Sequence, residues 1–163
     1  MFQQMRRKDR EIPEEQARNI LEKGEWGVLS TVNAEEWPCG TPLSYVLLGG
    51  SIYFHSAQSG QKISNLQARP KVCFSVVGRT LPVYDGSFTT LYESAMAFGL
   101  AAEVESSEEK VQALVALCQK YLPQEMGRAE ASLKAGLPRT AVWKIEIQHL
   151  TGKQRRLEKG TGK

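Results

Sequence analysis

The chain has 163 residues, of which 41% are hydrophobic and 24% charged, a balance that fits a globular protein and excludes a disordered or fibrous one. The formal net charge of +3 is concentrated at the two ends and does not support nucleic-acid binding, because affinity for a polyanion grows with the phosphates neutralised. No apolar run approaches the roughly 20 residues that span a bilayer, and no apolar segment follows the basic residues near the N-terminus, so we expect one cytoplasmic domain.

One helix and three strands are predicted for the first part of the chain. Residues 13–23 place apolar side chains at helical spacing, with a proline at the start and a glycine directly after the last residue. Three short runs rich in β-branched and aromatic residues follow, at 26–32, 40–48 and 51–56. The glycine pair between the last two runs is typical of a hairpin turn, so these strands are expected to be antiparallel.

The middle of the chain is predicted to contain a short helix, a strand, a loop and a longer bent strand. Residues 60–70 fit a helix that closes at a proline, and residues 71–77 fit a fourth strand. Residues 78–90 are rich in turn formers and are predicted as a loop. Residues 91–104 could form a helix or a strand, and we favour a bent strand with Gly99 at a bulge or barrel corner.

The last part of the chain is predicted to contain two helical segments and a strand. Residues 106–122 begin with Ser106 or Ser107 as cap and continue with helical spacing. Residues 123–136 fit a further helical piece, and residues 140–150 alternate as a sixth strand does. Because βαβ alternation is missing, the sequence predicts a mainly β fold, a small antiparallel barrel with flanking helices. The aromatic residues expected inside the barrel or at a dimer seam are Trp26, Trp37, Tyr45, Phe54 and Trp143.

The residues that most common catalytic sites need are not found together in this sequence. The two histidines, His55 and His149, are far apart and have no acidic or cysteine cluster nearby, so we predict no metal site built by side chains. Three widely spaced cysteines are interpreted as reduced thiols. Phosphate-binding glycine loops and a GxSxG nucleophile motif are not found in the sequence. Reactions that side chains alone cannot catalyse would therefore depend on a bound cofactor.

The stretch SIYFHSAQSGQK, residues 51–62, ends an apolar strand in a histidine and small polar residues and then places Lys62 at the start of a predicted helix. Its spacing alone fits either an ordinary polar turn or an anion site, in which hydroxyls, helix N–H groups and a cation hold a phosphate. His55 is likewise either a structural residue or a functional one.

This stretch, with residues 27–50 upstream, resembles the FMN-binding split-barrel superfamily of pyridoxamine 5'-phosphate oxidase over roughly residues 5–152. The runs MRRKDREI, PLSYV, IYFHSA with GQK, ESAMAFG and HLTGK occur in the order of its nitroimidazole-resistance (Nim) branch. The resemblance implies a six-stranded antiparallel split β-barrel over residues 1–152, followed by a basic tail at 153–163. It also implies a homodimer with FMN at the subunit interface.

The resemblance further implies which residues meet the cofactor. Those expected to bind FMN are Thr41, Pro42, Leu43, Ser44, His55, Ser56, Ala57, Lys62, Tyr92 and Ser94. The first four would lie along the flavin ring, the turn after His55 would hold the phosphate, and Tyr92 and Ser94 would reach the flavin from the facing subunit. His55 would be the catalytic residue, a proton donor or a ligand to the acceptor, since an unperturbed pKa near 6.5 suits proton transfer.

The function implied is an FMN-dependent reductase of small nitro-aromatic (5-nitroimidazole-like) or related acceptors. One alternative is a flavin or haem carrier or sensor without turnover, in which His55 would be an axial ligand to iron. Another is a dimeric interaction protein without cofactor. Vitamin B6 oxidation is not expected, because the basic residues that pyridoxamine 5'-phosphate oxidases place near the flavin phosphate are replaced by Thr41, Val46 and Gln61. Arg6, Arg7 and Lys153 either supply part of the missing charge or, as the simpler alternative, belong to solvated chain ends.

Overall fold

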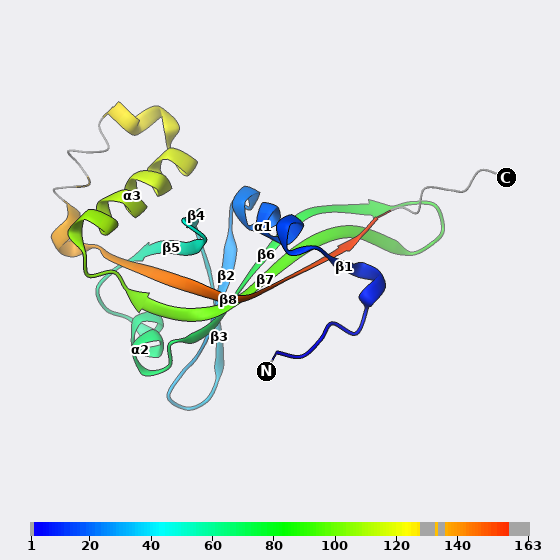
Figure 1. Ribbon diagram of the computed structural model, residues 1–163, viewed down its shortest axis with the longest axis horizontal. Helices are drawn as coiled ribbons and strands as arrows, with labels where there is room; N and C mark the ends of the chain where they lie inside the picture. Colours follow the sequence, from blue (N-terminus) through cyan, green and yellow to red (C-terminus); the bar gives the residue numbers. More distant parts are fainter. Residues whose placement is uncertain (1, 128–132, 134–135, 157–163) are drawn as a thin grey trace.

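The computed structural model describes residues 2–127, 133 and 136–156 (Figure 1). Its strands are β1 (Glu11–Ile12), β2 (Gly27–Val32), β3 (Pro38–Leu43), β4 (Val46–Leu48), β5 (Ser51–Ser56), β6 (Lys71–Val83), β7 (Thr89–Glu103) and β8 (Ala141–Arg155). Its helices are α1 (Glu14–Lys23), α2 (Gln61–Ala68) and α3 (Ser107–Tyr121), with short 3-10 turns at Lys8–Arg10, Pro123–Glu125 and Leu137–Arg139. The strands form one curled antiparallel sheet in the order β3-β2-β6-β7-β8-β5-β4, with β1 paired to β8.

This architecture confirms the mainly β split barrel with flanking helices, although the described residues form eight strands rather than six. One extra strand is the two-residue β1, and the other arises because the predicted strand 40–48 is interrupted after Leu43. The interruption has a local cause at Tyr45. Its N–H donates to the Tyr121 hydroxyl at 3.0 Å, and its carbonyl lies 2.9 Å from the same hydroxyl oxygen, so this backbone contacts α3 instead of pairing with a strand.

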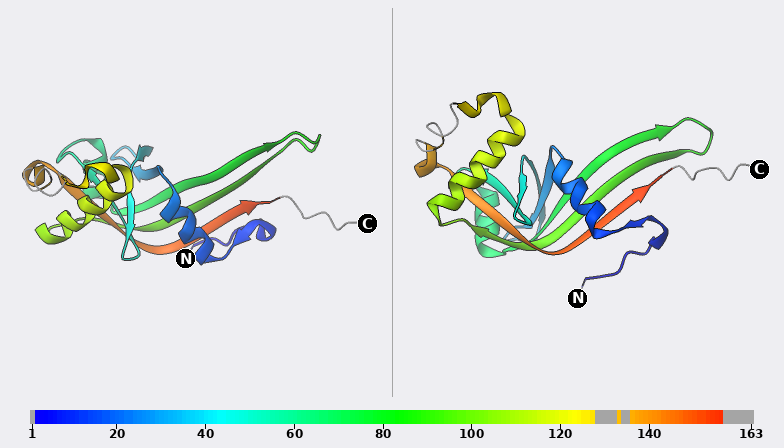
Figure 2. Two further views of the ribbon diagram at one scale, coloured as in Figure 1. Left: turned by 90° about the horizontal axis from the view of Figure 1, so that it is seen from above. Right: turned by 45° about the horizontal axis from the view of Figure 1, so that its top comes forward.

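The loop predicted for residues 78–90 is wrong for most of its length. β6 continues to Val83 and β7 begins at Thr89, with regular pairing that includes Pro82 opposite Thr90. The register shifts once, between Val77 and Thr80. The two strands form a long hairpin that projects beyond the body of the molecule, away from α3 (Figure 2).

The bent strand predicted around Gly99 is confirmed. Its pairing with β8 shifts register between Phe98 and Gly99. A Cβ atom at Gly99 would lie 2.2 Å from the carbonyl oxygen of Glu146, so the two backbones approach more closely than any side chain allows. This register shift is the bulge that the sequence predicts at Gly99.

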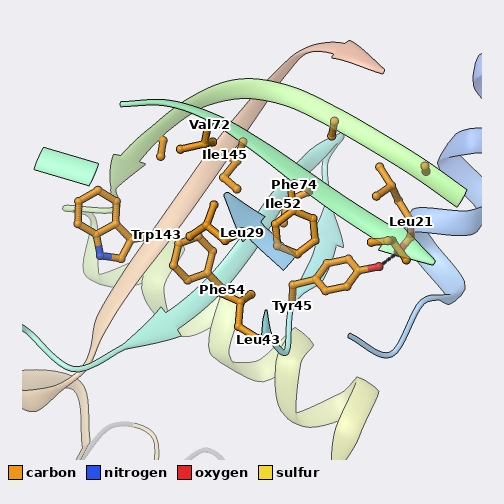
Figure 3. Close-up of a cluster of buried hydrophobic side chains, with 14 of the residues drawn as sticks. Leu21, Leu29, Leu43, Tyr45, Ile52, Phe54, Val72, Phe74, Trp143 and Ile145 are labelled. Atoms are coloured by element: carbon orange, nitrogen blue, oxygen red, sulfur yellow. Dashed lines mark hydrogen bonds between the residues drawn. The ribbon is translucent and has the colours of Figure 1, made fainter. Parts of the chain in front are cut away.

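The main core fills the inside of the curled sheet, where Leu29, Phe54 and Phe74 are fully buried (Figure 3). Tyr45 is also buried, and its hydroxyl donates to the backbone carbonyl of Leu21 in α1 at 2.5 Å. The predicted interior position is confirmed for three of the five aromatics, Tyr45, Phe54 and Trp143. Trp26 and Trp37 are 59% and 69% exposed, so the prediction that they lie inside the barrel is wrong.

The outer face of β2, β6 and β7 also carries apolar side chains, although it faces solvent in a single chain. Val77 is 66% exposed and Met96 is 41% exposed, and Val28 lies on the same side. Ser75 pairs with both Val28 and Met96, which places these residues in one row across the sheet. A sheet that is apolar on both faces is typical of one that is covered on both.

Helix α3 covers the end of the sheet formed by β4 and β5. Ser106 is its N-cap, because the Ser106 hydroxyl accepts a hydrogen bond from the Glu109 N–H. Its buried residues pack on the outward side chains of β5 and β8 in a second, smaller core. Much of the helical piece predicted for 123–136 lies outside the described residues. No described helix is long and apolar enough to cross a membrane.

Candidate functional site

His55 lies near the end of β5, with its side chain on the face that looks toward α3. Its neighbour Phe54 points into the barrel core, so alternation along the strand places His55 on the opposite side. Val142 of β8 is its cross-strand partner. Partial removal from water lowers the pKa of His55, and the positive charge of Lys62 lowers it further.

An apolar cavity of about 570 Å³ opens beside this imidazole. Leu114, Leu117 and Tyr121 of α3 form one wall, and Trp26 and Ser44 contribute from the sheet side, together with His55. The polar groups are few and lie near the strand ends. Such a hollow, with an imidazole of perturbed pKa, is the kind of site that takes a small organic ligand.

The turn between β5 and α2 carries several polar groups, some of which are hydrogen-bonded within the chain. The Ser56 hydroxyl donates to the Ala57 carbonyl at 2.8 Å. Gly60 has φ of 128° and caps α2 without any side-chain hydrogen bond. A Cβ at Gly60 would have no neighbour within 4 Å, so the start of the helix is open. The first N–H groups of α2 have no partner within the helix and can bind an anion.

Lys62 supplies the cation of this turn. Its ammonium lies 5.6 Å from the centroid of the Phe54 ring and so is held against the protein. Partial burial lowers its pKa. No described carboxylate lies within ion-pair distance of Lys62, which leaves its charge free for a ligand. Hydroxyls, helix N–H groups and an ammonium at one turn match the needs of a phosphate.

The residues predicted along the flavin ring lie at the end of β3 and just after it. Thr41, Pro42 and Leu43 are the last residues of β3, and Ser44 follows. β3 is the edge of the sheet and pairs only with β2, so the strand's other side has backbone groups without a strand partner. Those groups can bond the polar edge of a planar ligand.

Tyr92 and Ser94 are not brought to this site within one chain. They pair with Arg155 and Lys153 at the far end of β8, whereas His55 pairs with Val142 at its beginning. These positions on β8 are separated by roughly 35–45 Å of strand. The single chain therefore contains two separate groups of predicted cofactor-binding residues.

The end of α3 is fixed by residues that the sequence analysis did not single out. The Lys120 ammonium donates to the carbonyls of Gly24 at 2.7 Å and Tyr45 at 3.1 Å, and it lies 4.1 Å from the Tyr45 ring centroid. The Tyr121 hydroxyl donates to the Glu25 carbonyl at 2.5 Å. These bonds hold the cavity wall against the turn before β2. A lysine late in an amphipathic helix gives no sequence signal of such a role.

A comparison with known protein families identifies the family of this chain. The model of the family described as pyridoxamine 5'-phosphate oxidase matches residues 13–154. The chain belongs to this family, and the resemblance noted in its sequence is confirmed. No protein of curated function matches the chain significantly.

Several solved structures share the fold. A candidate 5-nitroimidazole antibiotic resistance protein from Bacteroides thetaiotaomicron is 24% identical, with a TM-score of 0.76, over 88% of this chain and 86% of that one. The flavocytochrome Anf3 from Azotobacter vinelandii is 19% identical, with a TM-score of 0.74, over 94% and 72%. An FAD- and haem-binding protein from Mycobacterium smegmatis is 18% identical, with a TM-score of 0.72, over 87% and 71%.

Proposed function

We propose that this protein is an FMN-binding oxidoreductase that acts as a homodimer and reduces small nitro-aromatic acceptors. The observation that carries the proposal is the open turn between β5 and α2, with Lys62 in the first turn of α2, directly beside His55 and an apolar cavity. Relatives of the fold that are described as flavin-binding or as linked to nitroimidazole resistance support it.

Each part of the site would have a separate task. Ser56, the N–H groups of α2 and Lys62 would hold the phosphate, and the edge of β3 would bond the ring. Bound flavin would supply the electrons for reduction. The cavity would hold the acceptor and exclude water. His55 has a lowered pKa, so at neutral pH its neutral imidazole would donate a hydrogen bond to a nitro oxygen.

Two observations support a homodimer. The outer face of β2, β6 and β7 exposes apolar side chains that a second subunit would cover. Tyr92 and Ser94 lie far from His55 in one chain, and a second copy would be needed to bring them to the same cofactor. The dimer would thus complete the site as well as bury the sheet.

A non-enzymatic haem or flavin carrier is the second candidate. The observation that favours it is the neutral imidazole of His55 at the mouth of an apolar cavity, an arrangement that suits an axial ligand to haem iron. Two relatives of the fold are described as a flavocytochrome and as an FAD- and haem-binding protein.

Absorption spectroscopy of the purified protein, titrated separately with FMN and haem, tests both candidates. The reductase requires flavin binding and steady oxidation of a reduced donor when a 5-nitroimidazole is added, with turnover much reduced in His55→Ala. Haem binding that is lost in His55→Ala, without turnover, would favour the carrier. A protein that binds neither cofactor contradicts both.

A further inference from the structure

A group of basic side chains surrounds Tyr92 and Ser94 at the base of the long hairpin. A guanidinium nitrogen of Arg10 donates to the Tyr92 hydroxyl at 3.3 Å. Lys153 is the cross-strand partner of Ser94, and its ammonium lies 5.9 Å from the centroid of the Tyr92 ring. The chain therefore gathers two cations from segments more than 140 residues apart, around residues predicted to meet a flavin.

The carboxylates near Arg10 and Lys153 mostly form ion pairs with other basic residues. Asp9 binds Arg7, and its nearest contact with Arg10 is 3.9 Å. Glu11 lies opposite Lys153 between β1 and β8, but its carboxylate pairs at 2.8 Å with the lysine three residues before it. Among the described residues no carboxylate lies within ion-pair distance of Lys153. The group is thus a positive surface with little internal neutralisation.

The turn between β5 and α2 in the same chain has few positive charges for the phosphate that it is proposed to hold. Hydroxyls and N–H groups are plentiful there, but Lys62 is the only lysine or arginine from Ser51 to Gln67. A phosphate monoester carries close to two negative charges at neutral pH. One partly buried ammonium leaves much of that charge without a partner.

We propose that Arg10 and Lys153 of one subunit complete the phosphate site that surrounds Lys62 of the other. This inference rests on the proposed function and adds which residues recognise the phosphate monoester of the cofactor. It also gives the two cations a role across the subunit boundary.

The position of the cations on the sheet supports this arrangement. Directly opposed residues of antiparallel strands share a face, so Lys153, Ser94 and Val77 lie on the same side of the sheet. That side is the apolar outer face proposed to meet the second subunit. Arg10 and Lys153 border this face, where protein interfaces place their polar rim.

Comparing FMN with riboflavin isolates phosphate recognition, because riboflavin lacks only the phosphate. Both would be titrated into the wild type, Arg10→Gln, Lys153→Gln and the control Lys71→Gln, which loses an exposed lysine elsewhere on β6. Each of the two test variants is expected to weaken FMN binding about tenfold or more and to leave riboflavin binding within about twofold of the wild type. Lys71→Gln should change neither affinity, and Lys153→Arg should retain FMN binding.

Mixed dimers test whether the cations act across the interface. Differently tagged Lys62→Gln and Lys153→Gln chains would be co-expressed and the mixed dimer purified. If the sites are shared between subunits, one site of the mixed dimer carries both changes and the other carries none. Titration should then show one FMN site per dimer with wild-type affinity. If both residues served a site within one chain, no intact site would be present.

The outcomes separate the inference from the proposed function. A wild-type protein that binds neither FMN nor riboflavin contradicts the proposed function and the inference with it. Flavin binding in which the wild type does not distinguish FMN from riboflavin, or in which the test variants weaken both equally, overturns the inference alone. Sedimentation of each variant as a dimer excludes loss of assembly as the cause.

Discussion

At the scale of single residues, the positive charge of Lys62 influences the protonation of His55, because both lie at the same turn. Loss of water around the side chains lowers the pKa of each, and the charge of Lys62 lowers that of His55 further. The His55 imidazole therefore stays neutral to a lower pH than an imidazole that is free in water. A proton-transfer step that used charged His55 would gain activity as the pH falls.

Removing the charge of Lys62 should raise the pKa of His55. We expect the imidazole of Lys62→Gln to titrate at a higher pH than in the wild type, closer to 6.5, because one of the two causes of the lowering is gone. NMR titration can follow this change, and a His149→Gln background leaves a single imidazole signal. Lys71→Gln serves as the charge control. An unchanged His55 pKa in Lys62→Gln would show that the charge of Lys62 does not reach the imidazole.

At the scale of secondary-structure elements, the start of α3 distinguishes two adjacent serines. The Ser106 hydroxyl accepts from the Glu109 N–H, whereas Ser107 is the first residue of the helix. We expect Ser106→Ala to lower the free energy of unfolding by about 1 kcal/mol, and Ser107→Ala to change it little. Urea denaturation of the two variants measures the difference. Equal effects would mean that the cap contributes no stability.

The bulge at Gly99 should tolerate no side chain. The Cβ of Gly99→Ala would collide with backbone atoms of β8, which cannot move aside as a side chain can. We expect a loss of about 1–3 kcal/mol in the free energy of unfolding, measured by thermal or urea denaturation. Gly127→Ala is the control, because a Cβ there has no neighbour within 4 Å. Equal stability of Gly99→Ala and the wild type would contradict the close approach.

Local sequence patterns predicted the elements that depend on neighbours along the chain. Helices α1 and α3 and the bulge at Gly99 follow from periodicity, caps and glycine position. The hairpin of β6 and β7 was missed because Gly78, Pro82 and Gly86 all favour turns, whereas only the last of them lies between the strands. Cross-strand pairing over this stretch outweighs the local preference of the first two.

For the candidate site, too, only the part formed by residues close together in the chain could be predicted from the sequence. The turn from His55 to Lys62 is contiguous, so its polar groups could be recognised together. The cavity wall could not, because Leu114 and Leu117 have the spacing of ordinary core residues. Only the family resemblance points to Tyr92 and Ser94, and their distance from His55 follows from the length of β8.

At the scale of the whole molecule, the outer sheet face should control assembly. We expect Val77→Asp and Met96→Asp to produce monomers, because a carboxylate would be buried in the proposed interface without a partner. Analytical ultracentrifugation measures this, and FMN affinity should fall in the same variants. Leu48→Asp, on the β4 hairpin away from this face, is the control. A monomeric wild type, or dimeric aspartate variants, would contradict the proposed interface.

In the proposed dimer, the distance between Tyr92 and His55 in one chain would tie cofactor retention to protein concentration. If one flavin touches both subunits, each bound molecule also holds the subunits together, and dilution below the dissociation constant of the dimer releases the cofactor. Excess FMN would oppose this dissociation by mass action. Dilute preparations would then lose their yellow colour on gel filtration, while concentrated ones of the same protein would keep it.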